Sequence, residues 1–166
     1  LKGVFGPAMT DYVIGWLLAI ERDVISRASH TQWTPSLEPR ITGKRLGIMG
    51  AGGIGAAIAL AAKPFGLEVI GLNSDGRAVE GFAACYPSAD RLVFAEGIDY
   101  LVSVLPKTAQ TENLIDHEVL TRLNPRAIVI NAGRGNAVVE ADLIASLNAC
   151  HLKAAVLDVF REEPLP

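Results

Sequence analysis

Three glycines at the spacing G-x-G-x-x-G, Gly50, Gly52 and Gly55, are the residues whose type and spacing point most directly to chemistry. They follow an apolar run and precede a helical pattern, which is the context in which this spacing binds a dinucleotide. The first glycine permits a tight turn, the second lets backbone approach a pyrophosphate, and the third lets helix and sheet pack closely. Amides at the helix start, where Gly53 and Ile54 stand, would then meet the anion. A turn that uses glycine only for steric reasons is the less favoured alternative.

The residues after the next apolar run bear on the choice between the two nicotinamide dinucleotides. An NAD site usually carries an acid at this strand end, where it binds the ribose 2′-hydroxyl. Here the position holds Asn73, and Ser74 and Arg77 are placed to contact a 2′-phosphate. Asp75, two residues after Asn73, favours NAD instead. For Arg77, a position that merely starts a solvated helix is an equally weighted alternative. We therefore expect NADP or NAD as the cofactor, with NADP slightly favoured.

Short apolar runs that alternate with helical patterns would position these residues. We expect strands at Arg45–Met49, Leu67–Leu72, Leu92–Phe94, Tyr100–Leu105, Ala127–Asn131 and Lys153–Val159. We expect helices at Pro7–Arg27, Gly53–Phe65, Arg77–Cys85, Asp116–Leu123 and Glu140–Ala149. Strands joined by crossover helices predict an α/β fold, a Rossmann doubly wound parallel sheet of about six strands preceded by a long N-terminal helix and an arm.

Composition excludes several other classes of protein. The chain has 166 residues, 50% of them hydrophobic and 20% charged, with a mean hydropathy of +0.31, which excludes intrinsic disorder. A net charge of −3 argues against nucleic acid as a partner. The only cysteines, Cys85 and Cys150, are too few and too far apart for a disulfide framework or a zinc site, so we expect no metal. No apolar run approaches the roughly 18 residues of a membrane span, so we expect a cytoplasmic protein without a membrane partner.

Three later segments carry motifs in a fixed order: LPKTAQT at 105–111, NAGRGNAVVEADLI at 131–144, and AAVLDVFREEPLP at 154–166. Together they resemble the D-isomer-specific 2-hydroxyacid dehydrogenases, in particular the glyoxylate/hydroxypyruvate reductase branch. The resemblance implies an NAD(P)-dependent oxidoreductase that transfers a hydride between the cofactor and a small 2-oxo or 2-hydroxy acid. It also implies cofactor contacts from these motifs, at Leu105, Pro106, Thr111, Ala132, Gly133, Arg134 and Asp158.

The resemblance assigns catalytic roles to Arg134 and Glu163. Arg134 takes the place of the arginine that binds the substrate's carboxylate and carbonyl, a role that suits a bidentate guanidinium. The alternative is that Arg134 has no role in substrate binding and only makes an ion pair at the surface. Glu163 matches the acid that holds the catalytic histidine and favours its protonated form, with the adjacent Glu162 as the alternative. Gly133 replaces the alanine or threonine of many members, a mild departure that should leave the arginine's role intact.

The resemblance also divides the chain. Residues 1–42 would form a dimerisation helix and arm, and residues 43–166 the Rossmann core. The assembly that the resemblance implies is a homodimer. His30, His117 and His151 do not match the family's catalytic histidine. We therefore expect that histidine and the substrate domain to be absent from this chain, leaving it inactive or nearly so by itself. Two alternatives stay open: a nucleotide-sensing, corepressor-like dimeric regulator of the same fold, or a formate- or phosphite-type dehydrogenase.

Overall fold

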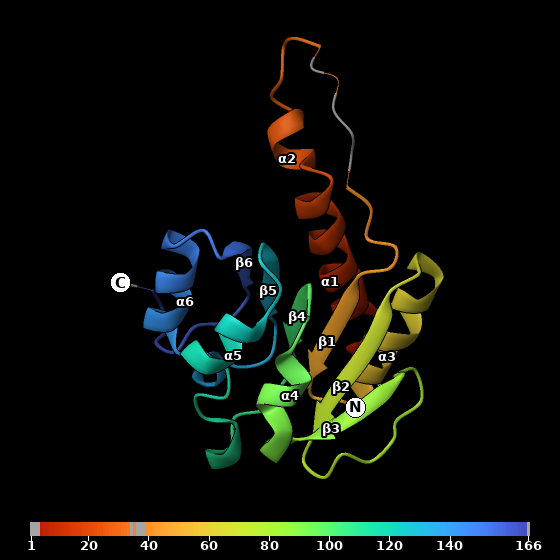
Figure 1. Cartoon of the computed structure of the whole chain (residues 1–166), viewed down its shortest axis with the longest axis vertical. Helices are drawn as coiled ribbons and strands as arrows, with labels where there is room; N and C mark the ends of the chain where they lie inside the picture. Colours follow the sequence, from red (N-terminus) through yellow and green to blue (C-terminus); the bar gives the residue numbers. More distant parts are fainter. Residues whose placement is uncertain (1–3, 34, 36–38, 166) are drawn as a thin grey trace.

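A single parallel sheet forms the centre of the molecule. The structure, a computed structural model, describes residues 4–33, 35 and 39–165. Its sheet has six strands in the order β3-β2-β1-β4-β5-β6 (Figure 1). The strands are β1 (Arg45–Met49), β2 (Glu68–Asn73), β3 (Ala84–Pro87), β4 (Tyr100–Ser103), β5 (Ala127–Asn131) and β6 (Leu152–Leu157). The predicted Rossmann doubly wound sheet is therefore confirmed.

The strand order places a topological switch point at β1. β1 pairs in parallel with β2 on one side and with β4 on the other. The chain thus runs outward from β1 in both directions, first through β2 and β3 and then through β4, β5 and β6. In open α/β sheets, ligands bind beyond the carboxyl ends of the strands at such a switch point. The segments that follow the carboxyl ends of the strands, after Met49, Asn73, Ser103, Asn131 and Leu157, are therefore where a functional site is expected.

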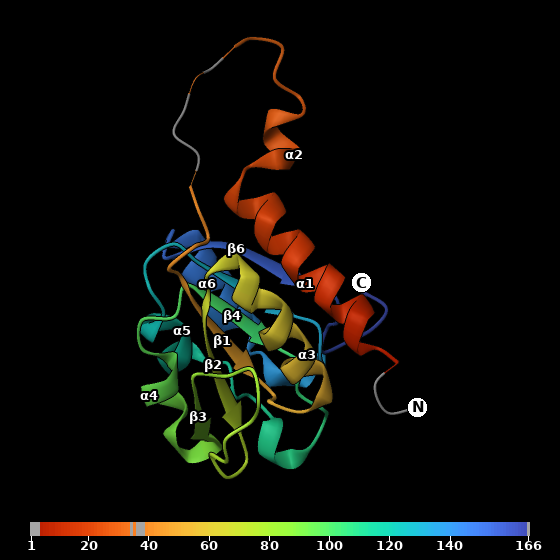
Figure 2. The same ribbon diagram turned by 90° about the vertical axis from the view of Figure 1, so that its right-hand side faces the viewer.

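Helices cover both faces of the sheet. The helices are α1 (Gly6–Glu21), α2 (Val24–Arg27), α3 (Gly53–Ala62), α4 (Arg91–Ala95), α5 (His117–Arg122) and α6 (Glu140–Asn148), with 3₁₀ turns η1 (Lys63–Phe65), η2 (Ser88–Asp90), η3 (Ala109–Thr111) and η4 (Gly135–Ala137). Figure 2 shows α1 and α3 on one side of the sheet and α4 and α5 on the other. No helix in the described ranges is long and apolar enough to cross a bilayer.

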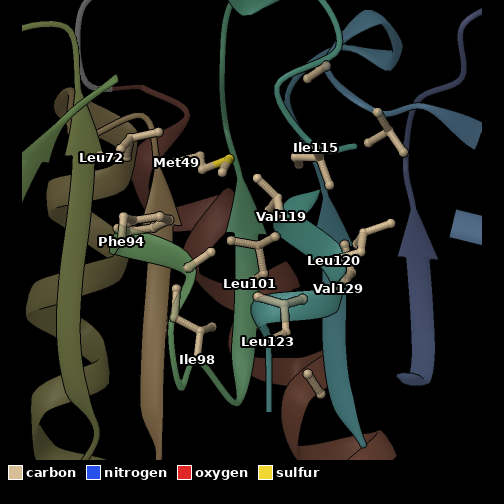
Figure 3. Packing of buried hydrophobic residues seen from close by; sticks show 14 of the residues in the cluster. Met49, Leu72, Phe94, Ile98, Leu101, Ile115, Val119, Leu120, Leu123 and Val129 are labelled. Carbon is tan, nitrogen blue, oxygen red and sulfur yellow. The ribbon is translucent and has the colours of Figure 1, made fainter. Parts of the chain in front are cut away.

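Two hydrophobic clusters hold these layers together. One joins α4, α5 and α6 to the sheet, and Figure 3 shows Phe94, Leu101 and Val119 within it. The other joins α1 and α3 to the opposite face, with Val13, Leu17 and Ile58 fully buried. β4 and β5 are buried at every position, as expected of central strands covered on both faces.

Two predicted elements between β2 and β4 are wrong. The predicted helix Arg77–Cys85 is a loop up to residue 83, and its last two residues begin β3. Gly76, just before it, and Gly81, within it, take positive φ angles of 73° and 101° that are unfavourable in a helix. The predicted strand Leu92–Phe94 lies inside α4, since a short apolar run carries too little periodicity to separate strand from buried helix. The sheet still has six strands because β3 takes the edge position.

The N-terminal helix is shorter than predicted. Pro7 stands in its first turn as expected, but α1 ends at Glu21, and Asp23 adopts a left-handed conformation with φ of 52° before α2 begins. α1 packs on α3, and α2 lies beyond the end of the sheet in both views (Figures 1 and 2). Within the arm predicted for 28–42, residues 34 and 36–38 lie outside the described residues.

Candidate functional site

The glycine loop joins β1 to α3 at the carboxyl edge of the sheet. Gly50 has a φ of +107°, and a Cβ there would lie 3.2 Å from the Val104 carbonyl oxygen. Its amide donates to the Leu72 carbonyl at 2.9 Å, which fixes the turn against β2. Gly52 caps α3 with extended backbone, and Gly53 and Ile54 form the first helical positions. The chain therefore turns from strand to helix in the way the spacing predicts.

The same loop fits a dinucleotide. A Cβ at Gly55 would overlap the Gly50 carbonyl oxygen, so this glycine is required for the helix to start against the strand. By contrast, a Cβ at Gly52 or Gly53 would meet no atom within 4 Å. The backbone there faces open space at the amino end of a ten-residue helix, where an anion is favoured. These residues would hold the pyrophosphate.

Asn73 shapes the loop after β2. Its Oδ1 accepts the Gly76 amide at 2.6 Å, and its Nδ2 donates to the Arg77 carbonyl at 2.8 Å. Asn73 thus acts as a turn former. Arg77 is exposed and forms an ion pair with Asp75 at 3.3 Å, and Ser74, directly before Asp75, is also exposed. Arg77, which favours NADP, and Asp75, which favours NAD, are therefore paired with each other.

The loop after β4 is held by Thr111. Its Oγ1 donates to the Pro106 carbonyl at 2.7 Å and accepts the Thr108 amide at 3.0 Å, which closes the loop on itself. Leu105 is buried and Pro106 is exposed. The hydrogen bonds of the buried Thr111 side chain to the backbone therefore hold residues 106–110 at the carboxyl edge of the sheet.

The turn after β5 presents Arg134. The buried Asn131 side chain accepts the Gly133 amide at 3.2 Å and donates to the Arg134 carbonyl at 3.1 Å. Ala132 donates its amide to the Ser103 carbonyl, and a Cβ on Gly133 would lie 2.6 Å from the Leu105 amide. The Arg134 side chain is exposed, and among the described residues its Nη1 bonds only the Gly133 carbonyl, at 2.7 Å. No carboxylate within the described chain pairs with Arg134.

The segment after β6 carries Asp158 and Glu163. The Asp158 amide donates to the Asn131 carbonyl at 3.0 Å, which places this residue beside the arginine turn. Burial and the nearby Asp158 carboxylate raise the pKa of Tyr12 on α1. Glu163 is exposed, and its Oε1 accepts the Phe160 amide at 2.8 Å.

A pocket of about 280 Å³ brings Arg134 and Glu163 together. It is lined by Lys107, Arg134, Gly135, Asn136, Val159, Phe160, Arg161 and Glu163. Arginine and glutamate from different loops thus border one volume, while Glu162 does not line it. A cation that can take a carboxylate and an acid that can hold a proton donor are arranged around a space sized for a small polar molecule.

Sequence reasoning missed several residues of this pocket. Lys107, Asn136 and Arg161 line it without having been singled out, although each lies inside one of the three motifs. Their position in those motifs was the available signal. None of the three histidines lines the pocket: His117 begins α5, and His151 contacts the Leu120 carbonyl at 3.0 Å.

The strand order, the glycine loop and the open helix start define a dinucleotide-binding domain. A family model described as "D-isomer specific 2-hydroxyacid dehydrogenase, NAD binding domain" matches residues 15–166. The chain belongs to the D-isomer-specific 2-hydroxyacid dehydrogenase family and comprises its NAD-binding domain.

Named relatives agree with this assignment. Glyoxylate/hydroxypyruvate reductase A of Klebsiella pneumoniae subsp. pneumoniae is 35% identical over 97% of this chain and 53% of its own length. A family member from Aeromonas salmonicida has a solved structure with a TM-score of 0.89 at 37% identity, covering 100% of this chain and 55% of that one. The NADPH-dependent glyoxylate/hydroxypyruvate reductase of Sinorhizobium meliloti, solved with NADP and sulfate, has a TM-score of 0.90 at 30% identity, covering 100% and 55%. The chain spans about half the length of the curated relatives it matches.

Proposed function

We propose that this chain is the cofactor-binding part of an NADPH-preferring reductase of small 2-oxo acids such as glyoxylate or hydroxypyruvate. The observation that carries the proposal is the shared pocket of Arg134 and Glu163 at the carboxyl edge of the sheet. The names of the relatives from Klebsiella and Sinorhizobium support the substrate class. Within the chain, residues 43–166 would act as the cofactor-binding core.

Each residue would have a distinct task. The glycine loop of Gly50, Gly52, Gly53 and Gly55 would hold the pyrophosphate, and Arg77 with Ser74 the 2′-phosphate. A bound NADPH supplies the hydride. Arg134 would bind the substrate carboxylate and polarise the carbonyl, because its guanidinium has no competing carboxylate among the described residues.

Glu163 would hold a histidine in its protonated form, ready to donate a proton to the developing alkoxide. None of the chain's own histidines lines the pocket, so the proposal places this donor on a part of the protein outside residues 1–166. This chain alone would then bind cofactor with little turnover, since losing a general acid costs about 10²–10⁴-fold in rate.

Steady-state kinetics of the full-length protein test the proposal. Arg134→Gln should lower kcat/KM for glyoxylate and hydroxypyruvate by about 10²-fold or more and change the KM for NADPH far less, because the lost side-chain contact is chiefly to substrate. Arg126→Gln, an exposed arginine before β5 at the opposite edge, is the matched control and should leave both values unchanged. Equal effects of the two substitutions, or no reduction of either acid by the wild type, would contradict the proposal.

We also propose that the protein is a homodimer that uses α1 and α2. An apolar pocket of about 320 Å³ on these helices is lined by Asp11, Tyr12, Gly15, Trp16, Ala19 and Ile25. Ile25 is 65% exposed and Trp33, in the arm, is 90% exposed, which is unusual for such side chains in contact with water. Ile25→Glu should dissociate the dimer in sedimentation, whereas Ile144→Glu, an exposed isoleucine on α6, should not. A wild type that stays monomeric at high concentration would contradict this assembly.

Two free thiols, Cys85 and Cys150, are consistent with a cytoplasmic location.

A further inference from the structure

The segment that carries Glu163 has no regular secondary structure of its own. β6 ends at Leu157, and residues 158–165 contain neither helix nor strand. Glu163 is exposed, and among the described residues its carboxylate bonds only the Phe160 amide, three residues earlier in the same segment. The position of Glu163 relative to the pocket therefore depends on whatever fastens this segment to the rest of the domain.

The Arg161 side chain makes most of that attachment. Its Nη1 donates to Glu112 Oε1 at 2.6 Å, and its Nη2 donates to Asn113 Oδ1 at 2.5 Å. The same Nη2 lies 3.0 Å from the Asn136 carbonyl oxygen and 2.7 Å from that of Val138. A guanidinium has five N–H donors in a planar fork, so one side chain can join several loops at once.

One of the two loops that Arg161 joins lines the pocket, at Asn136, and the other follows the loop of Lys107, which also lines it. Residues 112–113 follow the loop closed by Thr111, and residues 136–138 follow Arg134. These loops are bonded to each other, since the Asn113 amide donates to the Asn136 carbonyl at 2.9 Å and Asn136 Nδ2 donates to Glu112 Oε2 at 2.9 Å. Arg161 thus fastens the Glu163 segment to two loops that are bonded to each other, one of which follows Arg134 directly.

Two further observations support this attachment. Hydrogen bonds from Asn136 and Arg161 lower the pKa of Glu112, so that its carboxylate stays charged opposite the guanidinium. The Arg161 amide donates to Glu140 Oε1 at 3.0 Å, which fixes the backbone on α6.

We propose that Arg161 is a positioning residue: by joining the segment after β6 to the loops at 112–113 and 136–138, it holds Glu163 at the edge of the Arg134 pocket. This proposal rests on the proposed function only for the catalytic role of Glu163. The geometry of the attachment stands independently of it. Arg161 is not assigned any contact with substrate.

An NMR double-substitution experiment on this chain tests whether Arg161 keeps the segment of Phe160 and Glu163 in its folded conformation. In the wild type, Glu163→Gln should move the Phe160 amide proton signal, because that amide loses a charged acceptor. In an Arg161→Met background the same substitution should move the signal by less than about half as much, because the bond to Glu163 is no longer held. A wild-type-sized change in the Arg161→Met background would overturn the proposal.

Arg45→Met is the matched control. Arg45 also makes several side-chain bonds, to Glu68 and to the Glu96 carbonyl, but it lies at the amino end of β1. If the Phe160 response fell equally in this variant, the effect would be general loosening and the proposal would be wrong. Arg161→Lys keeps the charge opposite Glu112 and should restore part of the response.

A second readout separates this proposal from the proposed function. In the full-length protein, Arg161→Met should lower kcat for glyoxylate by about tenfold or more and leave the KM for NADPH unchanged, since misplacing a catalytic group by about 1 Å can cost about 10²-fold. A lost Phe160 response with unchanged kcat would contradict the catalytic role of Glu163 while upholding the attachment. An unchanged Phe160 response would contradict the attachment, whatever the kinetics show.

Discussion

Gly135 and Phe160 touch backbone to backbone, so closely that a Cβ on Gly135 would overlap the carbonyl of Phe160. The contact brings together two motifs that lie far apart in the sequence. One follows β5 and carries Arg134, and the other follows β6 and carries Glu163. The glycine is therefore required by the approach of two chain segments that together border the pocket.

Gly135→Ala should destabilise the protein. The added methyl group must displace the segment at Phe160, and overpacking of this kind costs about 1–3 kcal/mol of the free energy of unfolding. Gly53→Ala, in the chain without cofactor, is the matched control, because a Cβ there meets nothing within 4 Å and Gly53 lies in the first turn of α3. It should stabilise by about 0.5–1 kcal/mol through helix propensity. Urea denaturation of both variants checks the pair, and equal stabilities would contradict the observed contact.

The glycine loop allows binding and stability to be separated. Gly55→Ala should lower the thermal midpoint, because its Cβ would overlap the Gly50 carbonyl oxygen. Gly52→Ala adds a methyl group where there is free space, so the midpoint should stay within a few degrees while NADPH binding weakens. Thermal unfolding and calorimetric titration together test this. Unweakened NADPH binding by Gly52→Ala would show that the pyrophosphate does not lie against this residue.

Arg77 should determine the preference for the phosphorylated cofactor. Arg77→Gln should weaken NADPH binding by roughly 10–100-fold, as expected from losing one charge-assisted hydrogen bond, and leave NADH binding nearly unchanged. Asp75→Asn should have the opposite effect on NADPH, because it frees Arg77 from the ion pair at 3.3 Å. Parallel titrations with the two cofactors measure both. If Asp75→Asn weakened NADH binding selectively, Asp75 would be the ribose ligand instead.

Asp99 should contribute to acid sensitivity. Burial by itself would raise its pKa, but hydrogen bonds from the Arg45 amide, Asn124 and Lys44 outweigh burial and hold the pKa below the usual value. A carboxyl whose pKa is lowered by folding stabilises the fold above its unfolded pKa, near 3.9, and loses that contribution as pH falls through the folded value.

Asp99→Asn should therefore cost about 1–3 kcal/mol of unfolding free energy at pH 7 and much less near pH 3. Chemical denaturation at the two pH values measures the difference. The ion pair of Arg122 and Glu96 is exposed on both sides, so Glu96→Gln should change stability little at either pH. A cost for Asp99→Asn that is independent of pH would contradict the assigned role of its charge.

The sequence predicted the central strands because each is a nearly continuous apolar run, and β5 begins and ends where expected, at Ala127 and Asn131. β3 was not predicted, because Ala84–Pro87 is a short edge strand without a fully buried residue and so has no continuous apolar run. The glycine loop was predictable from local spacing. The Arg161 attachment was not, because its partners near residues 112 and 138 are brought to it only by the fold. The pairing of Asp75 with Arg77 likewise depends on a loop shaped by Asn73.

Calorimetric titration of this chain with NADPH and, separately, with NADH tests the central claim most directly. The account predicts one binding site per chain, tighter for NADPH than for NADH, and weakened for both by Gly52→Ala. Absence of binding by either dinucleotide would contradict the assignment of the glycine loop as the cofactor site.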